Sequence, residues 1–164
     1  MQNKNAIEAK SFDFAVRIVK LYQYITNEKK EFVLSKQLLR SGTSVGANVA
    51  EAERAQSQAD FYAKMSIALK EANETDYWLR LLYQTDYLNE NEYNSVSKNI
   101  NEIIALLVSI TKTVKATLQT ERKKNNGKIS AFQNHLERNE KRTTEKIPHS
   151  AFRIPHLVTN GGKL

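Results

Sequence analysis

The chain has 164 residues, of which 40% are hydrophobic and 26% charged, and its formal net charge is +7. This length suits one domain with an appended segment, and the absence of cysteine excludes disulfide bonds and thiolate zinc sites and fits a reducing cytoplasm. Because only five glycines and two prolines occur, the composition indicates a mainly helical protein and argues against a loop-rich or β-rich one.

The first predicted helix covers residues 11–27. Ser11 is a favourable N-cap residue, and the apolar side chains that follow it recur at helical spacing on one face. These inward-facing residues are Ala15, Ile18, Val19, Tyr22 and Ile25. A polar link over residues 27–31 then reverses the chain.

The second predicted helix begins at residue 32 or 35 and runs to residue 55. Its inner face is made mostly of small residues, including Gly42 and Gly46, and each glycine costs about 1 kcal/mol relative to alanine inside a helix. A sequence that keeps both glycines predicts close packing against another helix. The alternative is a helix that ends at residue 40 and a new one that begins near residue 44. The apolar period runs through the glycines unbroken, which favours one helix.

The outer face of this second helix has a basic bias. Its cations are Lys36, Arg40 and Arg54. These three side chains are candidate contacts for the phosphates of a nucleic acid, although most surface charge serves only solubility.

The third predicted helix covers residues 57–85 and starts with Ser57 and Asp60 in the spacing of a capping box. One stripe faces the core of a helical bundle and consists of Phe61, Met65, Ala68, Ala72, Thr75, Leu79 and Leu82. A second stripe lies on nearly the opposite side and consists of Ile67, Glu71, Glu74, Trp78 and Leu81.

The second stripe of this helix predicts an oligomer interface, because a chain of this length can cover only one of the two faces by itself. The alternative is a helix buried on all sides at the centre of a large protein, for which 164 residues leave too little chain. Glu71 and Glu74 are expected to pair with Arg or Lys across a helix or subunit boundary, since unpaired carboxylates are costly to bury.

The fourth predicted helix starts at Asn89 and Glu92, which repeat the capping arrangement, and runs to about residue 118. Its inward stripe consists of Ile100, Ile103, Leu107, Ile110 and Val114. Short links favour antiparallel neighbours, so residues 11–118 predict an all-α, up-down-up-down four-helix bundle. The strongly apolar run over residues 103–110 is too short to span a membrane, and the N-terminus lacks the apolar core of a signal peptide. We therefore expect a cytoplasmic protein without membrane contact.

Residues 119–164 differ in composition from the predicted bundle. Residues 1–120 contain 15 Lys or Arg against 14 Asp or Glu, a net charge of +1, whereas residues 121–164 contain 10 against 4, a net charge of +6. This pattern predicts a flexible, largely disordered basic tail with one short helix around residues 131–142. Its cations Arg122, Lys123, Lys124 and Lys128 are further candidates for binding nucleic acid.

No catalytic or metal site is predicted. Carboxylate metal sites in helical bundles need Glu-x-x-His pairs, and no histidine occurs before His135. The serines of the bundle region have no nearby histidine in the sequence, and the chain lacks a Gly-rich phosphate loop. We therefore expect a protein that is not an enzyme and that needs no cofactor.

The longest patterned run of the chain, over residues 38–82, reads LLRSGTSVGANVAEAERAQSQADFYAKMSIALKEANETDYWLRLL. With the predicted helices on either side of it, this run resembles the small bacterial four-helix-bundle proteins encoded in intervening sequences of 23S ribosomal RNA genes. Their relatives include the accessory variability determinant of diversity-generating retroelements. The resemblance covers about residues 11–116 and rests on the whole pattern, since no catalytic motif contributes to it.

The resemblance implies an antiparallel four-helix bundle that assembles into a homopentamer. It also implies nucleic acid, RNA above all, as a partner, and a reverse transcriptase in the retroelement branch. Arg40, Ser44, Asn48 and Glu51 match the helix-two signature of the family, and Glu71, Glu74 and Trp78 match its helix-three signature. Asn48 is thereby assigned, with Gly42 and Gly46, to close helix packing.

Two classes of function remain open from the sequence. In the first, the assembled bundle binds RNA or RNA/DNA through repeated basic patches, with salt-sensitive and sequence-tolerant phosphate contacts. In the second, the protein is a scaffold or adaptor whose target is another protein, docked near Trp78 or on another outer face. The basic tail and the family resemblance favour nucleic-acid binding, whereas the nearly neutral bundle favours the scaffold.

Overall fold

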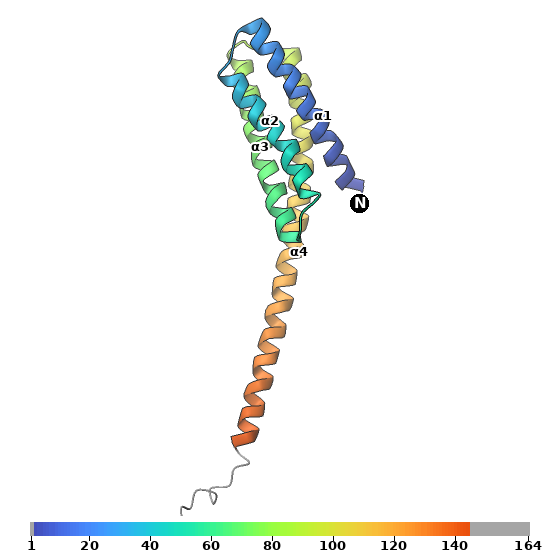
Figure 1. Ribbon diagram of the computed structural model, residues 1–164, viewed down its shortest axis with the longest axis vertical. Coiled ribbons are helices and arrows are strands. Elements are labelled where there is room, and N and C mark those ends of the chain that lie inside the picture. Colours follow the sequence, from blue (N-terminus) through green and yellow to red (C-terminus); the bar gives the residue numbers. More distant parts are fainter. Residues whose placement is uncertain (1, 145–164) are drawn as a thin grey trace, which may run out of the picture. The chain divides into compact units, whose positions relative to one another are not determined.

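The computed structural model describes the backbone of residues 2–144 and the side chains of residues 6–139. Four long helices and one short π-helical turn form its elements, in the order α1 Gln2–Tyr24, η1 Ile25–Lys29, α2 Leu34–Ala52, α3 Gln58–Gln84 and α4 Glu90–Thr144. Successive helices run antiparallel in the bundle (Figure 1). The predicted all-α, up-down-up-down four-helix bundle is confirmed.

The chain divides into two compact units, residues 1–120 and residues 121–164. The first unit contains α1, η1, α2, α3 and the first part of α4. The second contains the rest of α4, and the segment 145–164 lies outside the described residues.

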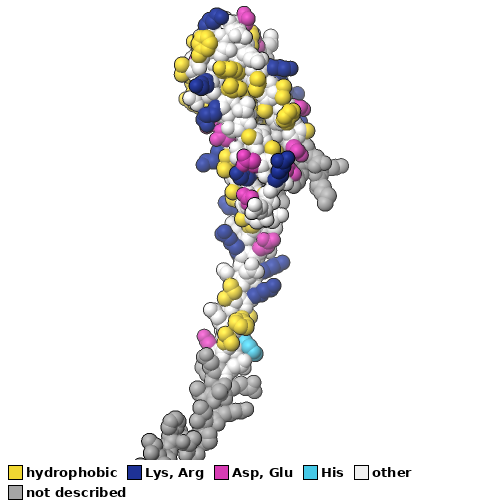
Figure 2. Space-filling model, in the orientation of Figure 1, with side chains coloured by type: hydrophobic (Ala, Val, Ile, Leu, Met, Phe, Trp, Pro, Cys, Tyr) yellow, Lys and Arg dark blue, Asp and Glu magenta, His cyan; other side chains and the backbone are white. Residues whose placement is uncertain are grey.

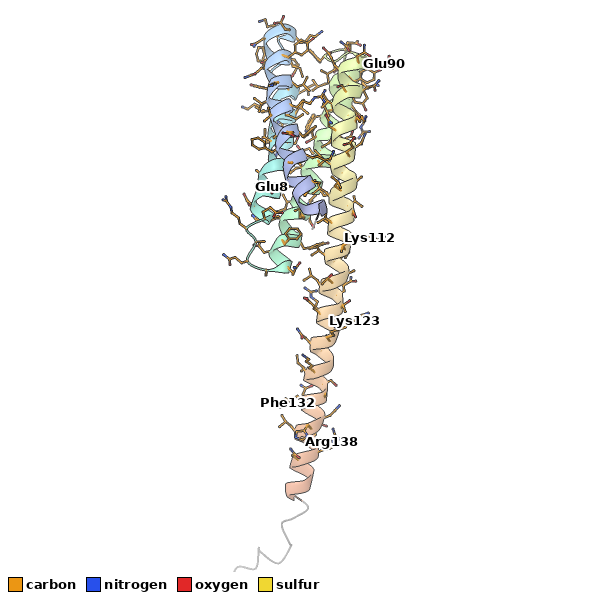
Figure 3. The ribbon with its side chains drawn as sticks, turned by 90° about the vertical axis from the view of Figure 1, so that its right-hand side faces the viewer. Glu8, Glu90, Lys112, Lys123, Phe132 and Arg138 are labelled. Carbon is orange, nitrogen blue, oxygen red and sulfur yellow. The ribbon has the colours of Figure 1, made fainter. Side chains whose placement is uncertain are left out.

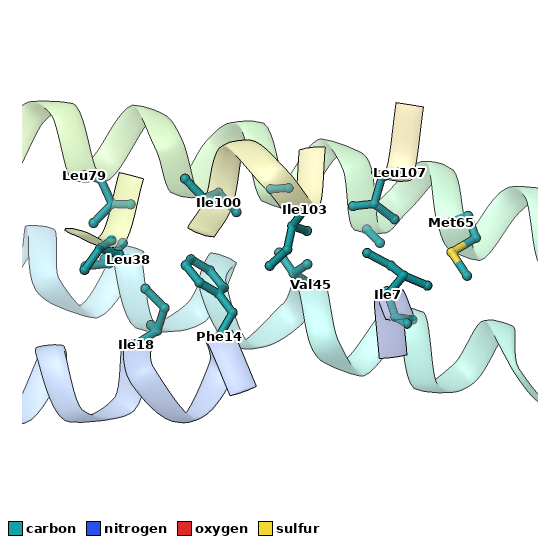
Figure 4. Packing of buried hydrophobic residues seen from close by; sticks show 14 of the residues in the cluster. Ile7, Phe14, Ile18, Leu38, Val45, Met65, Leu79, Ile100, Ile103 and Leu107 are labelled. Atoms are coloured by element: carbon teal, nitrogen blue, oxygen red, sulfur yellow. The ribbon is translucent and has the colours of Figure 1, made fainter. Parts of the chain in front are cut away.

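The core of the first unit is a continuous apolar cluster to which all four helices contribute (Figure 4). Along each helix its largest fully buried side chains are separated by three or four residues or by sums of such steps, as one buried face of a helix requires. They are Ile7, Ile18, Ile25, Leu38, Val45, Val49, Met65, Leu79, Leu82, Ile100, Ile103 and Leu107.

The predicted start of the first helix is wrong. α1 begins at Gln2, and Ser11 lies inside the helix, where its hydroxyl donates to the Glu8 carbonyl over 3.0 Å. Ile7 and Phe14 are buried, whereas Val19, predicted to face inward, is 37% exposed. The buried face of α1 therefore starts one turn earlier and is rotated relative to the predicted stripe.

Side-chain caps fix the starts of α3 and α4 as predicted. Ser57 has an extended backbone and accepts from the Asp60 amide over 3.1 Å. The Asn89 side chain accepts from the Glu92 amide over 3.0 Å, and the Asn89 amide donates to the Glu92 carboxylate over 2.8 Å. This reciprocal pair is a capping box, which satisfies two helix-end groups at once.

The start of α2 depends on Glu31, which the sequence did not single out. Its buried carboxylate accepts from the amides of Val33, Leu34 and Ser35 over 2.9, 2.8 and 2.7 Å. Burial by itself would raise the pKa of Glu31, but these hydrogen bonds stabilise the charged form and hold the pKa below its usual value. The negative charge also suits the positive end of the helix dipole.

α2 runs through both of its glycines without a break. A Cβ atom at Gly42 would lie 2.9 Å from two side-chain carbons of Ile18, and one at Gly46 would lie 3.1 Å from the Ser11 carbonyl oxygen. Both glycines therefore lie where α2 approaches α1 closely. Asn48 lies on the same helix, and its side-chain amide donates to the Ser44 carbonyl over 2.9 Å.

The predicted end of the fourth helix near residue 118 is also wrong, because α4 continues to Thr144. The short helix predicted around residues 131–142 is part of this longer one. Every side chain over residues 121–139 is exposed to solvent. The segment from residue 119 to Thr144, predicted to be largely disordered, is therefore helical.

α4 is the one described helix that is long and apolar enough, by length and composition alone, to cross a membrane. Its residues Ile100, Ile103 and Leu107 are at most 1% exposed and pack in the core of the bundle. Only 11% of the apolar stretch that meets this criterion is buried, so packing in the bundle accounts for just part of the apolar character of this helix.

Candidate binding surfaces

The outer side of α2 and α3 carries a cluster of one cation, two carboxylates and one indole, which we call the Arg40 cluster. It consists of Arg40 from α2 and Glu71, Glu74 and Trp78 from α3. The Arg40 guanidinium forms an ion pair with Glu74, and a second Arg40 nitrogen lies 3.9 Å from a Glu71 carboxylate oxygen. The Trp78 indole donates to Glu74 over 3.1 Å. The expected pairing of both carboxylates with an arginine across a helix boundary is thus present within one chain.

Glu71 is incompletely satisfied within this cluster. Its Oε2 atom is buried and accepts no hydrogen bond, since the Arg40 nitrogen near it lies beyond hydrogen-bonding distance. A buried carboxylate oxygen without a donor is unfavourable by about 1–3 kcal/mol or more. The Arg40 guanidinium, 3.9 Å away, offsets only part of this cost.

Three apolar side chains belong to the same stripe of α3. Ile67 is 41% exposed, Leu81 is partly exposed, and Trp78 is partly buried against the core. Trp78 also contacts the half-exposed ring of Tyr77 edge to face, with the ring centroids 5.0 Å apart. The structure brings the predicted interface residues Ile67, Glu71, Glu74, Trp78 and Leu81 onto one helix face that the chain covers only in part.

The three candidate phosphate contacts Lys36, Arg40 and Arg54, on α2 and just after it, differ in their surroundings. Arg40 is held by two carboxylates, so its charge is largely neutralised within the chain. Lys36 and Arg54 are exposed, and neither forms an ion pair with any side chain that the structure describes. Nearby, Glu51 pairs with Lys64 of α3, which raises the pKa of that lysine. This surface therefore offers two isolated cations and no dense basic patch.

The cations of the second unit form a denser group. Arg122, Lys123, Lys124 and Lys128 lie within two turns of α4, all are exposed, and none pairs with a carboxylate among the described side chains. We call them the α4 basic cluster. Lys123 lies on this part of the helix in Figure 3, and Figure 2 shows cations gathered along it.

A shallow polar cleft between α1 and α4 was missed by the sequence analysis. Lys10 pairs with Glu102 over 2.9 Å, while Arg17 donates to the Ser95 carbonyl over 3.1 Å and to the Asn99 side chain. The pairing with Lys10 lowers the pKa of Glu102. Because the polar groups of the cleft bond to one another, they join two helices and leave few groups for a ligand. In the sequence this cleft appears only as polar residues beside the buried faces of two helices. Most helices have such residues, so the sequence alone does not identify the cleft.

Among the described residues, no group of three or more His, Asp or Glu side chains is placed to hold a metal ion. The first histidine of the sequence is His135, so no histidine lies in the bundle. His135 is exposed on α4, and its ring lies 3.1 Å from the side-chain amide of Asn139.

The known proteins that are similar to this chain match mainly its first unit. The sequence profile of the 23S rRNA-intervening sequence protein family matches residues 3–109. A crystal structure of a protein of unknown function from the S23 ribosomal protein family of Bacteroides thetaiotaomicron is 58% identical, with a TM-score of 0.66. The match covers 67% of this chain and 98% of that chain. No curated protein matches the chain. The α4 basic cluster lies outside the residues that the family profile matches.

Proposed function

The chain belongs to the 23S rRNA-intervening sequence protein family, and from this premise we propose that it is a non-catalytic, oligomeric bundle protein that binds RNA. The α4 basic cluster is the observation that supports RNA binding. Its four cations are exposed, lie within two helical turns and form no ion pair with any described side chain. Phosphate contacts need accessible cations of this kind.

The balance of charge supports binding through α4 more than through the bundle. Residues 1–120 have a net charge of +1 and residues 121–164 have a net charge of +6. In addition, Arg40 is engaged by Glu71 and Glu74, which would compete with phosphate for its guanidinium. Binding is expected to be salt-sensitive and tolerant of sequence, because phosphates carry no sequence information.

Two matched variants of the full chain test the location of the RNA site. One replaces Arg122, Lys123 and Lys124 with glutamine, and the other replaces Lys36, Arg40 and Arg54 with glutamine, so both lose three positive charges. Fluorescence anisotropy with a labelled single-stranded RNA over a salt series measures affinity and its salt slope. The α4 variant is expected to lose affinity, and the slope is expected to fall by about 2, or about 0.7 for each lost phosphate contact.

The outcomes separate the alternatives. A loss confined to the Lys36, Arg40 and Arg54 variant would move the site to the bundle. Equal binding by both variants and the wild type would contradict a cationic site at either place. If the wild type does not bind RNA at any salt concentration, the proposed function fails.

Oligomerisation is the second part of the proposal, and it uses the outer stripe of α3, which we call the α3 stripe and which consists of Ile67, Glu71, Glu74, Trp78 and Leu81. The partial exposure of its apolar side chains Ile67, Trp78 and Leu81 supports this role. A second copy would cover these side chains. Several copies would also repeat the α4 basic cluster and increase avidity for RNA.

A protein scaffold is the second candidate function, and the same α3 stripe supports it. In this case a different protein would cover Trp78 and Ile67. The reverse transcriptase implied by the family resemblance is one such partner, and this association stays a prediction. Monomeric protein that does not bind RNA would favour this candidate.

A further inference from the structure

Asparagine is followed directly by glycine at one place in the part of the chain that the structure describes, at Asn126 and Gly127 of α4. Both residues are exposed, and so are their neighbours in the sequence. A Cβ atom at Gly127 would meet nothing within 4 Å. Packing therefore does not hinder access to the side chain of Asn126 or to the peptide bond that follows it.

The helix is weak at this dipeptide. Asn125, Asn126 and Gly127 are consecutive, and all three have low helix propensity. Every side chain over residues 121–139 is exposed, so no buried contact holds this turn in place. Helical turns with exposed backbone hydrogen bonds and no buried contacts open locally at a low cost in free energy.

We propose that Asn126 is a site of spontaneous deamidation, for which the chain itself supplies the nucleophile. When the turn opens, the backbone nitrogen of Gly127 attacks the side-chain carbonyl carbon of Asn126 and closes a succinimide ring. The bond from this carbon to the side-chain nitrogen breaks, and that nitrogen leaves as ammonia with the proton of the Gly127 amide. Water then opens the ring and leaves aspartate or isoaspartate at position 126.

Gly127 makes the reaction favourable at this position. A side chain on the following residue crowds the attacking nitrogen and restricts backbone rotation, whereas glycine has no Cβ atom and reaches conformations closed to other residues. Asn125 has the same amide but is followed by Asn126, whose Cβ atom opposes the attack. The reaction is therefore expected at Asn126 and much more slowly at Asn125.

A carboxylate at position 126 would change the α4 basic cluster. Arg122 and Lys123 precede residue 126 by four and three positions, so they lie one turn away on the same side of the helix. Lys123 is labelled on this part of α4 in Figure 3. Opposite charges at this spacing attract each other, so the new carboxylate would compete with phosphate for both cations.

This consequence rests on the proposed RNA binding. Deamidation removes one unit of net positive charge from the segment that binds RNA and engages two of its four cations. Isoaspartate also places an extra carbon atom in the backbone, which interrupts the helix. Because the reaction needs only water, RNA affinity is expected to fall with the age of the protein.

Peptide mass spectrometry of the full chain, after incubation at mildly alkaline pH and proteolysis, tests the modification. The product peptide shows the mass gain of an amide converted to a carboxyl group. Asn160, the other asparagine that precedes a glycine, lies outside the described residues and is the internal control, so incubation continues until it has reacted. Gly127→Ala is expected to slow conversion of Asn126 by at least about fivefold, because alanine favours the helix and crowds the nitrogen.

Three results would overturn the modification site. The first is an unchanged Asn126 when Asn160 has reacted. The second is conversion of Asn126 in Gly127→Ala at the rate of the wild type. The third is equal conversion of Asn125 and Asn126, because it would show that Gly127 has no special role.

RNA-binding anisotropy over a salt series tests the consequence. Asn126→Asp reproduces the charge of the product. Ser130→Asp is the matched control, because it adds the same charge at an exposed position of α4 that has no cation three or four residues away. Asn126→Asp is expected to bind RNA more weakly than this control, with a salt slope smaller than that of the wild type by about 0.7 for each lost phosphate contact.

The two measurements keep this inference apart from the proposed function. Equal RNA binding by Asn126→Asp and Ser130→Asp would overturn the effect on RNA while the wild type still binds. A wild type that does not bind RNA would overturn the proposed function and this effect together. Conversion of Asn126 that depends on Gly127 supports the modification site in either case.

Discussion

At the scale of single residues, Gly42 determines how closely α1 and α2 approach. A methyl group there would lie 2.9 Å from Cγ1 and Cγ2 of Ile18, which is completely buried and has little room to move. Overpacking of this kind costs about 1–3 kcal/mol, while alanine improves helix propensity by about 1 kcal/mol. The two effects oppose each other, and the steric term is the larger.

We therefore expect Gly42→Ala to lower the free energy of unfolding by up to about 2 kcal/mol. Chemical denaturation followed by circular dichroism measures this difference. Gly127→Ala is the matched control, because the new methyl group has no neighbour within 4 Å. Equal or higher stability of Gly42→Ala would mean that Ile18 and α1 shift at little cost.

Glu31 gives the bundle a defined response to acid. Its pKa is lowered in the folded state because backbone amides bind the charged carboxylate more strongly than burial penalises it. A carboxyl group with a lowered folded pKa stabilises the fold above its unfolded pKa and loses this contribution as pH falls through the folded pKa.

Glu31→Gln is therefore expected to be less stable than the wild type at neutral pH, by about 1–2 kcal/mol as for other lost helix caps. The difference should begin to shrink as pH falls below about 4.5, the ordinary pKa of the carboxyl, and should shrink further as pH falls through the lower folded-state pKa of Glu31. Thermal unfolding at a series of pH values measures it. A constant difference between pH 7 and pH 3 would contradict the role of the charge.

At the scale of elements, periodicity and caps predicted most of the bundle. The starts of α3 and α4 were predictable because Ser57 and Asn89 each precede an acidic residue by three positions. The start of α1 was not, because Ser11 has the chemistry of a cap but satisfies its hydroxyl inside the helix. Ile7, one turn earlier, was the missed sign that the apolar period begins before Ser11.

The candidate sites were predictable only in part from the sequence. The stripe on α3 followed from its period, but the pairing of Arg40 with Glu71 and Glu74 depends on how α2 and α3 pack together. The length of α4 was underestimated because its inward apolar stripe ends near residue 118 and the segment beyond it is basic, a composition typical of disordered tails. Such a composition does not exclude a helix whose side chains are all exposed.

Gly127→Ala tests the weakness of this part of α4. Alanine is more favourable than glycine by about 1 kcal/mol inside a helix, and no neighbour opposes the added methyl group. We expect slower amide hydrogen exchange over residues 121–139 and a stronger helical signal in circular dichroism. The midpoint of unfolding of the bundle should stay unchanged, and unaltered exchange would contradict the expected weakness.

At the scale of the whole molecule, the proposed assembly uses a face of α3 that one chain leaves partly open. Ile67→Glu adds a charge at an exposed position of the α3 stripe, and Trp78→Ala removes its largest side chain. Both variants are expected to lower the native mass measured by light scattering, since buried interfaces tolerate unpaired charge and lost aromatic anchors poorly.

Tyr77→Ala is the control for this assembly experiment, because Tyr77 is an exposed aromatic neighbour outside the α3 stripe. Ile67→Glu is the more direct variant, since Trp78 also packs on the core and its loss can destabilise the fold. A native mass that Ile67→Glu leaves unchanged would reject this interface.

The buried apolar residues of the described chain all lie between Ile7 and Leu107, whereas the α4 basic cluster lies beyond Thr120. A substitution in the later segment therefore replaces no core side chain, and one in the core changes no cation of the cluster. Selection can act on the two segments separately, so the cluster can vary in sequence without a cost to the packing of the bundle.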